Sequence, residues 1–185
     1  GAVLLFGMLQ WARVREPVTP RRSPNRLTGV FRWLSGVPAS PGWPATLGPL
    51  LSRGGAVTVR PVRVRDAKSW SDLRIRNQNS LLPWEPTGVG SWADRHQPAS
   101  WPPLYAILKS EAKRGTILPF VIELDGAYVG QLTVGNIQRG AVRTAWIGYW
   151  IDQAHFGQGI ATAAVALGVD HCFGPVGLHR LEATV

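Results

Sequence analysis

The sequence predicts an α/β fold, in which helices cover a mixed β-sheet. Strand-like and helix-like segments follow one another in the order β, α, α, β, β, β, α, β from residue 56 onward. The last three elements form a β-α-β unit, whose two strands should be parallel neighbours in one sheet. An apolar fraction of 45% is normal for a globular domain.

The first half of the folded part contains one strand and two helices. AVTVRPVRV has β-branched residues at alternate positions and is expected to form the first strand. Asp66 is expected to cap a helix that runs through WSDLRIRNQ. A loop rich in proline and tryptophan, SLLPWEPTGVGSW, leads to a second helix, PPLYAILKSEAKR. Gly115 follows this helix, at the position where glycine commonly ends one.

The second half contains three strands, a helix and a last strand. Asp125-Gly126 joins ILPFVIEL to AYVGQLTVGNI and is a strong signal for a two-residue hairpin. A turn at residues 138–140 leads into VRTAWIGYWI, the fourth strand. A helix is expected from about Gly159 to Cys172, and LHRLEATV is expected to be the fifth strand.

Composition divides the chain into two parts. Residues 1–55 contain seven prolines and eight glycines and show no sustained period of a helix or a strand. This extension is therefore expected to be disordered or loosely packed, and residues 56–185 are expected to form one domain. Two interpretations of the extension stay open, namely a basic arm that contacts RNA or a partner and an extension without its own function.

The basic charge lies mainly in the extension. The formal net charge is +9, but residues 1–55 carry seven arginines and one acidic residue, whereas residues 56–185 carry thirteen Lys or Arg and ten Asp or Glu. A mildly basic domain suits a ligand with a few phosphates. The single cysteine, Cys172, favours a reducing, cytoplasmic location. The four histidines lack metal-site spacing, and no apolar run approaches the ~18 residues of a membrane span.

A glycine pair stands between the fourth strand and the following helix. Residues 157–162 read G-Q-G-I-A-T. The first N–H groups of a helix have no partner within it, and glycine lets a pyrophosphate approach the backbone closely. Thr162 stands where a dinucleotide-binding loop has its third glycine, and no Lys-Ser/Thr follows. The loop is therefore interpreted as a phosphate site of another type, with a plain tight turn as the alternative.

Two segments resemble one enzyme family. AWIGYWIDQAHFGQGIATAAVALGVDHCF is similar to the acetyl-CoA-binding segment of the GNAT superfamily of N-acetyltransferases, a strand followed by Q/R-x-x-G-x-G/A and a helix. Gly157 and Gly159 match this pattern, whereas Ala154 stands at the Q/R position, with Gln153 one place earlier. RIRNQNSLLPWEP resembles the substrate-side loop of RimJ-like enzymes, the ribosomal-protein alanine N-acetyltransferases, of actinobacterial type. The resemblance begins near Val57 and continues to the end of the chain.

The resemblance implies a GNAT fold whose fourth and fifth strands splay apart around acetyl-CoA. The pantetheine arm is expected on the edge of the fourth strand, and the diphosphate on the amides of the glycine loop. Family members continue after the fifth strand, so we expect the C-terminal part, which supplies the general acid, to be missing here. The residues expected at the coenzyme are Trp150, Ile151, Asp152, Phe156, Gly157, Gln158, Gly159, Ile160 and Ala161.

The resemblance also implies that an amine attacks the thioester directly, without an enzyme nucleophile. A backbone N–H near Tyr149 or Trp150 is expected to stabilise the developing negative charge. Glu182 is the candidate general base. Glu123 and Glu85 are weaker candidates, and an ordinary strand carboxylate is the alternative interpretation of Glu182.

Three residues are expected to contact the acceptor. Trp84 would form a wall of the substrate pocket, and Glu85 would bind the incoming amine as an anion. Asn136 would contact the substrate backbone. A loop anchor is the alternative for Trp84, and a turn residue is the alternative for Asn136.

We therefore expect an acetyl-CoA-dependent acetyltransferase that acts on a protein N-terminal α-amine, with alanine of a ribosomal protein as the acceptor. An acetyltransferase for a small-molecule amine and a non-catalytic, CoA-binding ribosome-associated factor are the alternatives. Neither a metal nor a membrane is expected as a partner. Ribosome association and a homodimer stay open.

Overall fold

The structure, a computed structural model, describes residues 40–183. Within this range, six strands form one sheet in the order β1-β2-β3-β4-β5-β6, so that each strand lies beside its neighbours in the chain. Neighbours from β1 to β5 are antiparallel, and β5 and β6 are parallel. The strands are β1 Leu47–Ser52, β2 Gly55–Pro61, β3 Leu118–Leu124, β4 Ala127–Gln138, β5 Thr144–Ile151 and β6 Arg180–Glu182.

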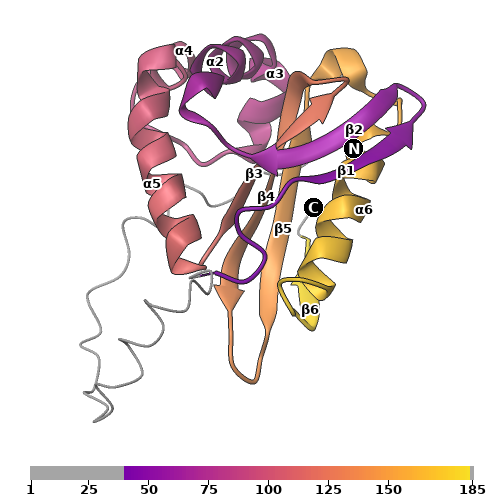
Figure 1. The fold of residues 1–185 in the computed structure, drawn as a ribbon. Coiled ribbons are helices and arrows are strands. Elements are labelled where there is room, and N and C mark those ends of the chain that lie inside the picture. Colours follow the sequence, from indigo (N-terminus) through magenta and orange to yellow (C-terminus); the bar gives the residue numbers. More distant parts are fainter. Residues whose placement is uncertain (1–39, 184–185) are drawn as a thin grey trace, which may run out of the picture.

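Helices cover both faces of this sheet (Figure 1). Helix α6 packs on one face, and α2 to α5 gather on the other. The α-helices are α2 Ala67–Arg76, α3 Gln78–Leu81, α4 Trp92–Arg95, α5 Trp101–Arg114 and α6 Ile160–Phe173. Four 3₁₀ turns within residues 40–183 connect them: η1 Val64–Asp66, η2 Leu82–Trp84, η3 Pro98–Ser100 and η4 Gln153–His155. The predicted α/β class with a mixed sheet is confirmed.

The predicted turns and helix ends are confirmed where the backbone requires a positive φ. Asp125 and Gly126 have φ values of 49° and 83° and join paired residues of β3 and β4 in a two-residue hairpin. Gly115 has a φ of 74° at the C-terminus of α5. Both positions suit residues that tolerate the left-handed region. The β-α-β unit is also confirmed, because β5 and β6 are parallel neighbours connected through α6.

The largest apolar core lies between the sheet and α6. Small residues on α6 allow this helix to approach closely, since a Cβ on Gly168 would lie 3.1 Å from Leu132 Cδ1. Members of this core from several elements are Val57, Phe120, Leu132, Val134, Ile147, Ile160 and Ala164. A second core on the opposite face centres on Trp70 and Trp101, whose rings are 5.2 Å apart. The sheet therefore buries residues on both faces.

The ordered part begins earlier than the composition predicted. We expected the first strand at residue 56 and no regular element in residues 1–55, but β1 (Leu47–Ser52) pairs antiparallel with β2. Pro49 interrupts the alternation that marks a strand, and the register is irregular beside it. Proline is tolerated here because β1 is the edge strand of the sheet. The expectation for residues 1–39 lies outside the described residues.

The segment before β1 is attached to the core through two contacts. The Trp43 ring packs edge-on against Phe120, with centroids 5.3 Å apart. His171 Nε2 donates to the Gly42 carbonyl at 2.7 Å, which places the proton of this ring on Nε2. These contacts bring residues 40–46 into the domain that was expected to begin at residue 56.

The cap predicted for Asp66 is replaced by an ion pair. Asp66 is buried and accepts from both Arg60 Nη atoms at 2.9 Å, and its Oδ2 also accepts from Arg63 N–H at 2.7 Å. Arg60 Nε lies 2.5 Å from Glu123 Oε1. A buried carboxylate requires such partners, and the guanidinium provides them in a bidentate pair. Glu123, one of the weaker base candidates, is therefore already paired with Arg60.

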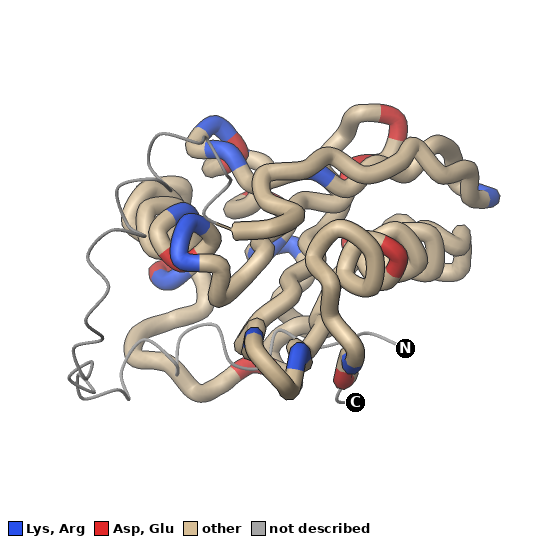
Figure 2. The backbone as a smooth tube through the Cα atoms, turned by 60° about the horizontal axis from the view of Figure 1, so that its bottom comes forward, with Lys and Arg blue, Asp and Glu red and all other residues tan. Residues whose placement is uncertain are grey.

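Opposite charges are interspersed along the described part of the chain. Figure 2 shows Asp and Glu beside Lys and Arg on several elements. Exposed pairs such as Lys68 with Asp72 (2.5 Å) and Arg114 with Glu111 (2.6 Å) occur on helix surfaces. Each such pair contributes only about 0–1 kcal/mol to stability.

Candidate functional site

The glycine loop begins α6 with two residues in the left-handed region. Gly157 and Gly159 have φ values of 74° and 79°, and Gly159 is the N-cap of the helix. Residues with a Cβ rarely adopt this backbone conformation. A Cβ on Gly157 would meet nothing within 4 Å, so the loop surface is open beside it. The glycines are therefore required by backbone conformation, and they leave the amides accessible.

A run of amides in this loop has no hydrogen-bond acceptor among the residues that the structure describes. The first backbone hydrogen bond of α6 runs from Ala163 N–H to Gly159 O at 3.0 Å. Among residues 40–183, no backbone carbonyl accepts from the N–H groups of residues 157–161. The partial positive charge of a helix N-terminus is concentrated on such groups. The arrangement can bind an anion through several N–H donors.

A buried carboxylate fixes the turn that precedes the glycine loop. The Asp152 side chain is 1% exposed, accepts from Asn77 Nδ2 at 2.9 Å, and forms an ion pair with Arg76. Asn77 Oδ1 in turn accepts from Gln153 N–H at 2.9 Å. Burial raises the pKa of Asp152, but the hydrogen bonds from Asn77 and Arg76 outweigh it and hold the pKa below its ordinary value. This contact was not predicted from the sequence, where an Asp directly after a strand is the only local signal for it.

The outer edge of β5 is free along most of its length. β6 pairs with β5 only at Thr144, Ala145 and Trp146. Within residues 40–183, the segment from Ile147 to Ile151 therefore has no strand partner on that side. This free edge leads directly to the glycine loop.

The register with β4 decides which backbone groups face the free edge. Asp152 N–H donates to Val129 O at 2.8 Å, so the groups of every second residue before it also face β4. The carbonyl of Trp150 accordingly lies against β4, where a Cβ on Gly130 would be 2.2 Å from it. Tyr149 and Ile151 therefore direct their N–H and C=O groups to the free edge.

Three predicted coenzyme contacts, at Trp150, Asp152 and Phe156, stay predictions, but their backbone groups already have partners within the protein. The backbone N–H of Asp152 is bound to β4, and its carbonyl accepts from His155 N–H at 2.9 Å. The backbone of Trp150 faces β4 as well, and Phe156 N–H donates to Gln153 O at 3.1 Å. The sequence identified the strand and the loop but could not tell which edge each group faces.

The remaining predicted contacts stay predictions with a compatible geometry. Ile151 faces the free edge, and the amides at Gly157, Gln158, Gly159, Ile160 and Ala161 lie in the run without acceptors. The Gln158 side chain turns back, with Nε2 3.4 Å from the Ala154 carbonyl. The Tyr149 N–H, predicted to stabilise the oxyanion, also faces the free edge.

The loop that contains Trp84 and Glu85 is attached to α2 by a buried ion pair. The Arg74 guanidinium donates to the Glu85 carboxylate, and the two side chains are 5% and 9% exposed. Arg74 also lies over the rings of Trp92 and Trp150, at 5.0 and 5.6 Å from their centroids. Since Glu85 is neutralised, this geometry favours a structural role over binding of an incoming amine. Trp84 is exposed beside it, and its contact with the acceptor stays a prediction.

His96 completes this cluster as a neutral ring. Its Nε2 accepts from Arg74 Nη2 at 3.0 Å, and its Nδ1–H donates to Trp92 O at 2.8 Å. Burial and the charge of Arg74 lower the pKa of His96 from 6.5 to about 4. The ring therefore supports the guanidinium without adding a second buried positive charge.

Three buried polar groups at this cluster, two of Arg74 and one of Tyr128, have no hydrogen-bond partner within residues 40–183. They are the Nε and Nη1 groups of Arg74 and the hydroxyl of Tyr128. Burial raises the pKa of Tyr128, so its hydroxyl remains a neutral donor. Such groups cost about 1–3 kcal/mol each when unpaired. The face of the sheet that carries Trp150 can therefore accept a polar group or water.

Glu182 lies on the same face as this cluster but closer to the other end of β5. Leu181 packs toward the α6 core, so its neighbours Arg180 and Glu182 point to the opposite face. Glu182 pairs with Arg180 Nε at 3.0 Å, and its side chain is 54% exposed. It lies opposite Trp146, three residues or about 10 Å along the strand from Tyr149. Its role as general base stays a prediction.

The backbone conformation at position 136 explains why an asparagine stands there. Its φ is 50°, and it lies in an irregularity of the β4–β5 register between Gly135 and Gln138. Asparagine tolerates the left-handed region better than most residues. Asn136 thus lies within β4 at an irregularity of the strand, and its contact with substrate stays a prediction.

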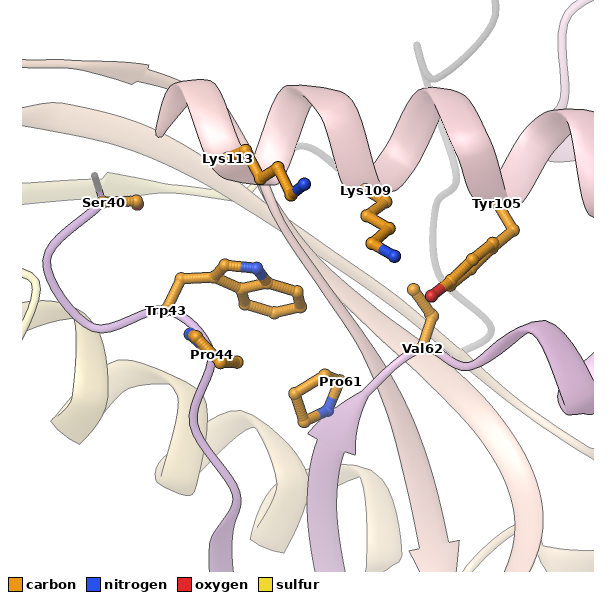
Figure 3. A pocket seen from close by; sticks show the side chains of 8 residues that line it. All are labelled: Ser40, Trp43, Pro44, Pro61, Val62, Tyr105, Lys109 and Lys113. Carbon is orange, nitrogen blue, oxygen red and sulfur yellow. The ribbon is translucent and has the colours of Figure 1, made fainter. Parts of the chain in front are cut away.

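A cavity of about 590 Å³ lies apart from these residues. It is bounded by the segment before β1, the end of β2 and α5, and Figure 3 shows Lys109 and Lys113 directed toward it beside the Trp43 ring. Its lining residues are Ser40, Trp43, Pro44, Pro61, Val62, Tyr105, Lys109 and Lys113. No predicted site residue lines it, so it does not belong to the glycine-loop site.

Two further findings concern the described residues only. Residues 40–183 contain no group of three or more His, Cys, Asp or Glu that could hold a metal ion. None of the helices in the same range is long and apolar enough to cross a membrane.

The pKa of His96 predicts a pH dependence of stability. Between pH 6.5 and about 4 the unfolded chain binds a proton at this residue that the folded protein does not bind. The free energy of unfolding should therefore decrease by ~3 kcal/mol as the pH falls through this range. Urea unfolding of the wild type and of His96→Gln over this range measures the effect, which the variant should lack. His179→Gln, at an exposed histidine, is the control, and equal slopes in all three proteins would contradict the prediction.

Comparisons with known proteins agree with this geometry. The family profile described as "Acetyltransferase (GNAT) domain" matches residues 56–185. The Probable N-acetyltransferase YjcK of Bacillus subtilis (strain 168) is 31% identical over 145 residues, which cover 72% of this chain and 73% of that protein.

Two solved structures extend the comparison. Mycobacterium smegmatis RimJ in complex with CoA-disulfide is 56% identical, with a TM-score of 0.78 over 79% of this chain and 70% of that chain. The ribosomal-protein-S5-alanine acetyltransferase from Vibrio fischeri is 27% identical, with a TM-score of 0.61 over 68% of each chain. The predicted resemblance to RimJ-like N-acetyltransferases is confirmed. The chain belongs to the GNAT family of acetyltransferases.

Proposed function

We propose that this chain transfers the acetyl group of acetyl-CoA to the N-terminal α-amine of a protein, and that alanine of a ribosomal protein is the acceptor. The observation that carries the coenzyme part is the run of unpartnered amides at the start of α6. The acceptor part is supported by the similarity to RimJ and to the Vibrio fischeri alanine acetyltransferase. With a ribosomal protein as the acceptor, we also propose that the enzyme is cytoplasmic.

The loop has the features that a diphosphate requires. Residues 157–161 offer consecutive N–H groups without acceptors, and the two glycines keep side chains away from them. Each charge-assisted hydrogen bond to a phosphate contributes about 1.5–3 kcal/mol. Several such bonds at one helix N-terminus fit a dianionic group without a metal.

The free edge of β5 would hold the arm of the coenzyme and orient its reactive end. The thioester supplies an activated acetyl group that an amine can attack directly. The N–H of Tyr149 faces the free edge and would stabilise negative charge on the carbonyl oxygen. A peptide α-amine has a pKa near 8, so part of it is neutral at pH 7 and needs only modest help from a base.

Glu182 is the proposed base, acting through water. It is accessible and lies on the face that carries Trp146, about 10 Å along β5 from Tyr149, which is too far for direct proton transfer. Glu182→Gln should lower kcat by about 10²-fold, with little change in KM for acetyl-CoA. An unchanged kcat would assign the base to another residue.

The glycine-loop proposal predicts that Gly159→Glu abolishes CoA binding. The variant places a carboxylate among the donors and forces a residue with a Cβ to a φ of 79°. Calorimetric titration with CoA measures the loss. Gly140→Glu is the matched control, because Gly140 has a φ of 84° and open space around it but lies in the β4–β5 turn. Equal affinity of Gly159→Glu and the wild type would reject the site.

The acceptor is tested with peptides and with cell proteins. A peptide that begins with alanine should be acetylated at its α-amine, and the same peptide with a blocked N-terminus and a free lysine should not react. Mass spectrometry of proteins from cells with and without the enzyme should show the difference on N-termini of ribosomal proteins. Turnover of small amines alone would favour a small-molecule acetyltransferase, and CoA binding without any turnover would favour a non-catalytic factor.

A further inference from the structure

The tip of the β1–β2 hairpin reaches the glycine loop. Arg53, at this tip, donates from Nη2 to the carbonyl of Gly157 at 3.0 Å, although the two residues are 104 positions apart in the chain. Figure 1 shows the hairpin beside the end of α6 that follows the loop. The first strand of this hairpin is the element that composition did not predict.

Close packing holds the hairpin tip against the loop. A Cβ on Gly54 would lie 2.6 Å from Gln158 Oε1 and 3.1 Å from Ile160 Cδ1, so a larger residue would require these side chains to shift. Ser52 lies on the other side of the tip, with its Cβ 3.9 Å from a Cβ placed on Gly159. The position of Arg53 is therefore determined by contacts on both sides of it.

We propose that Arg53 binds a phosphate group of the coenzyme, an inference that rests on the proposed function. A guanidinium has five N–H donors, and only one of them is used by the Gly157 carbonyl. Arg53 is exposed, and no carboxylate of residues 40–183 forms an ion pair with it.

Other basic residues near the loop contact a carboxylate. Arg76 and His155, which lie near the same loop, both contact the buried carboxylate of Asp152. Arg53 differs from Arg76 in that no carboxylate of residues 40–183 pairs with it, and the Gly157 carbonyl uses only one of its N–H donors. Its planar fork matches the geometry of a phosphate, and it would add a side-chain clamp to the backbone donors of the loop.

Calorimetric titration of CoA into the wild type, Arg53→Ala and Arg65→Ala tests the proposal. Arg65 is a control because it is also an exposed arginine, at the start of the segment that leads into α2. We expect Arg53→Ala to bind CoA about 10-fold more weakly and Arg65→Ala to bind it like the wild type. Arg53→Lys, which keeps the charge without the fork, should lie between them. Wild-type affinity in Arg53→Ala would overturn the proposal.

Coenzyme fragments separate phosphate binding from an indirect effect on the loop. If Arg53 contacts the 3′-phosphate, the difference between wild type and Arg53→Ala should disappear with 3′-dephospho-CoA. If Arg53 contacts the diphosphate, the difference should persist with 3′-dephospho-CoA and disappear with pantetheine, measured by NMR titration. An equal loss with pantetheine would overturn the proposal. A wild type that binds no CoA would instead reject the proposed function itself.

Discussion

The site depends on one buried carboxylate. Asp152 directly follows β5 and is buried, and burying a carboxylate without hydrogen-bond donors would be costly. Asn77 and Arg76 at the end of α2 supply them, and the same Asn77 accepts from the next backbone N–H after Asp152. The end of a central strand, the first turn of the glycine loop and the helix on the opposite face are therefore joined at a single point.

Only a few residues separate Asp152 from the backbone N–H groups that can bind an anion. The loop turns through two glycines with positive φ and enters α6 with its first amides unpaired. Glycine in such positions costs conformational entropy on folding. The contacts of Asp152 on one side and of the β1–β2 hairpin on the other offset this cost, because they hold the loop in one conformation. A preorganised loop loses less entropy when an anion binds.

The two faces of the sheet bury different kinds of residue. The face toward α6 is apolar and supports the helix whose N-terminus carries the anion site. The opposite face buries Arg74 against Glu85, His96 and two tryptophans, and this cluster attaches the L-P-W-E-P loop to α2. The low pKa of His96 keeps the ring an acceptor, so that one buried cation meets one buried anion. The free edge of β5 lies where the two faces meet.

The sequence by itself determined the features that depend on local backbone conformation. Asp125-Gly126, Gly115 and the glycine pair before α6 each mark a turn or a helix end where a positive φ is required, and these were located correctly. The family was also recognisable, because its glycine pattern and its L-P-W-E-P segment are contiguous in the chain.

Only the tertiary structure decided what depends on pairing between distant residues. The edge strand β1 was not predicted, because Pro49 interrupts the alternation of residues that is typical of a strand. Its pairing with β2, which is not visible in the sequence, makes this segment a strand. From the sequence, Glu85 was expected to be an anion that is free to bind an amine. In the structure, its charge is neutralised by Arg74. Asn77 meets Asp152 across 75 positions, and Arg53 meets Gly157 across 104. Periodicity and turn signals describe neighbours along the chain, whereas burial, register and ion pairing are set by which elements the fold brings together.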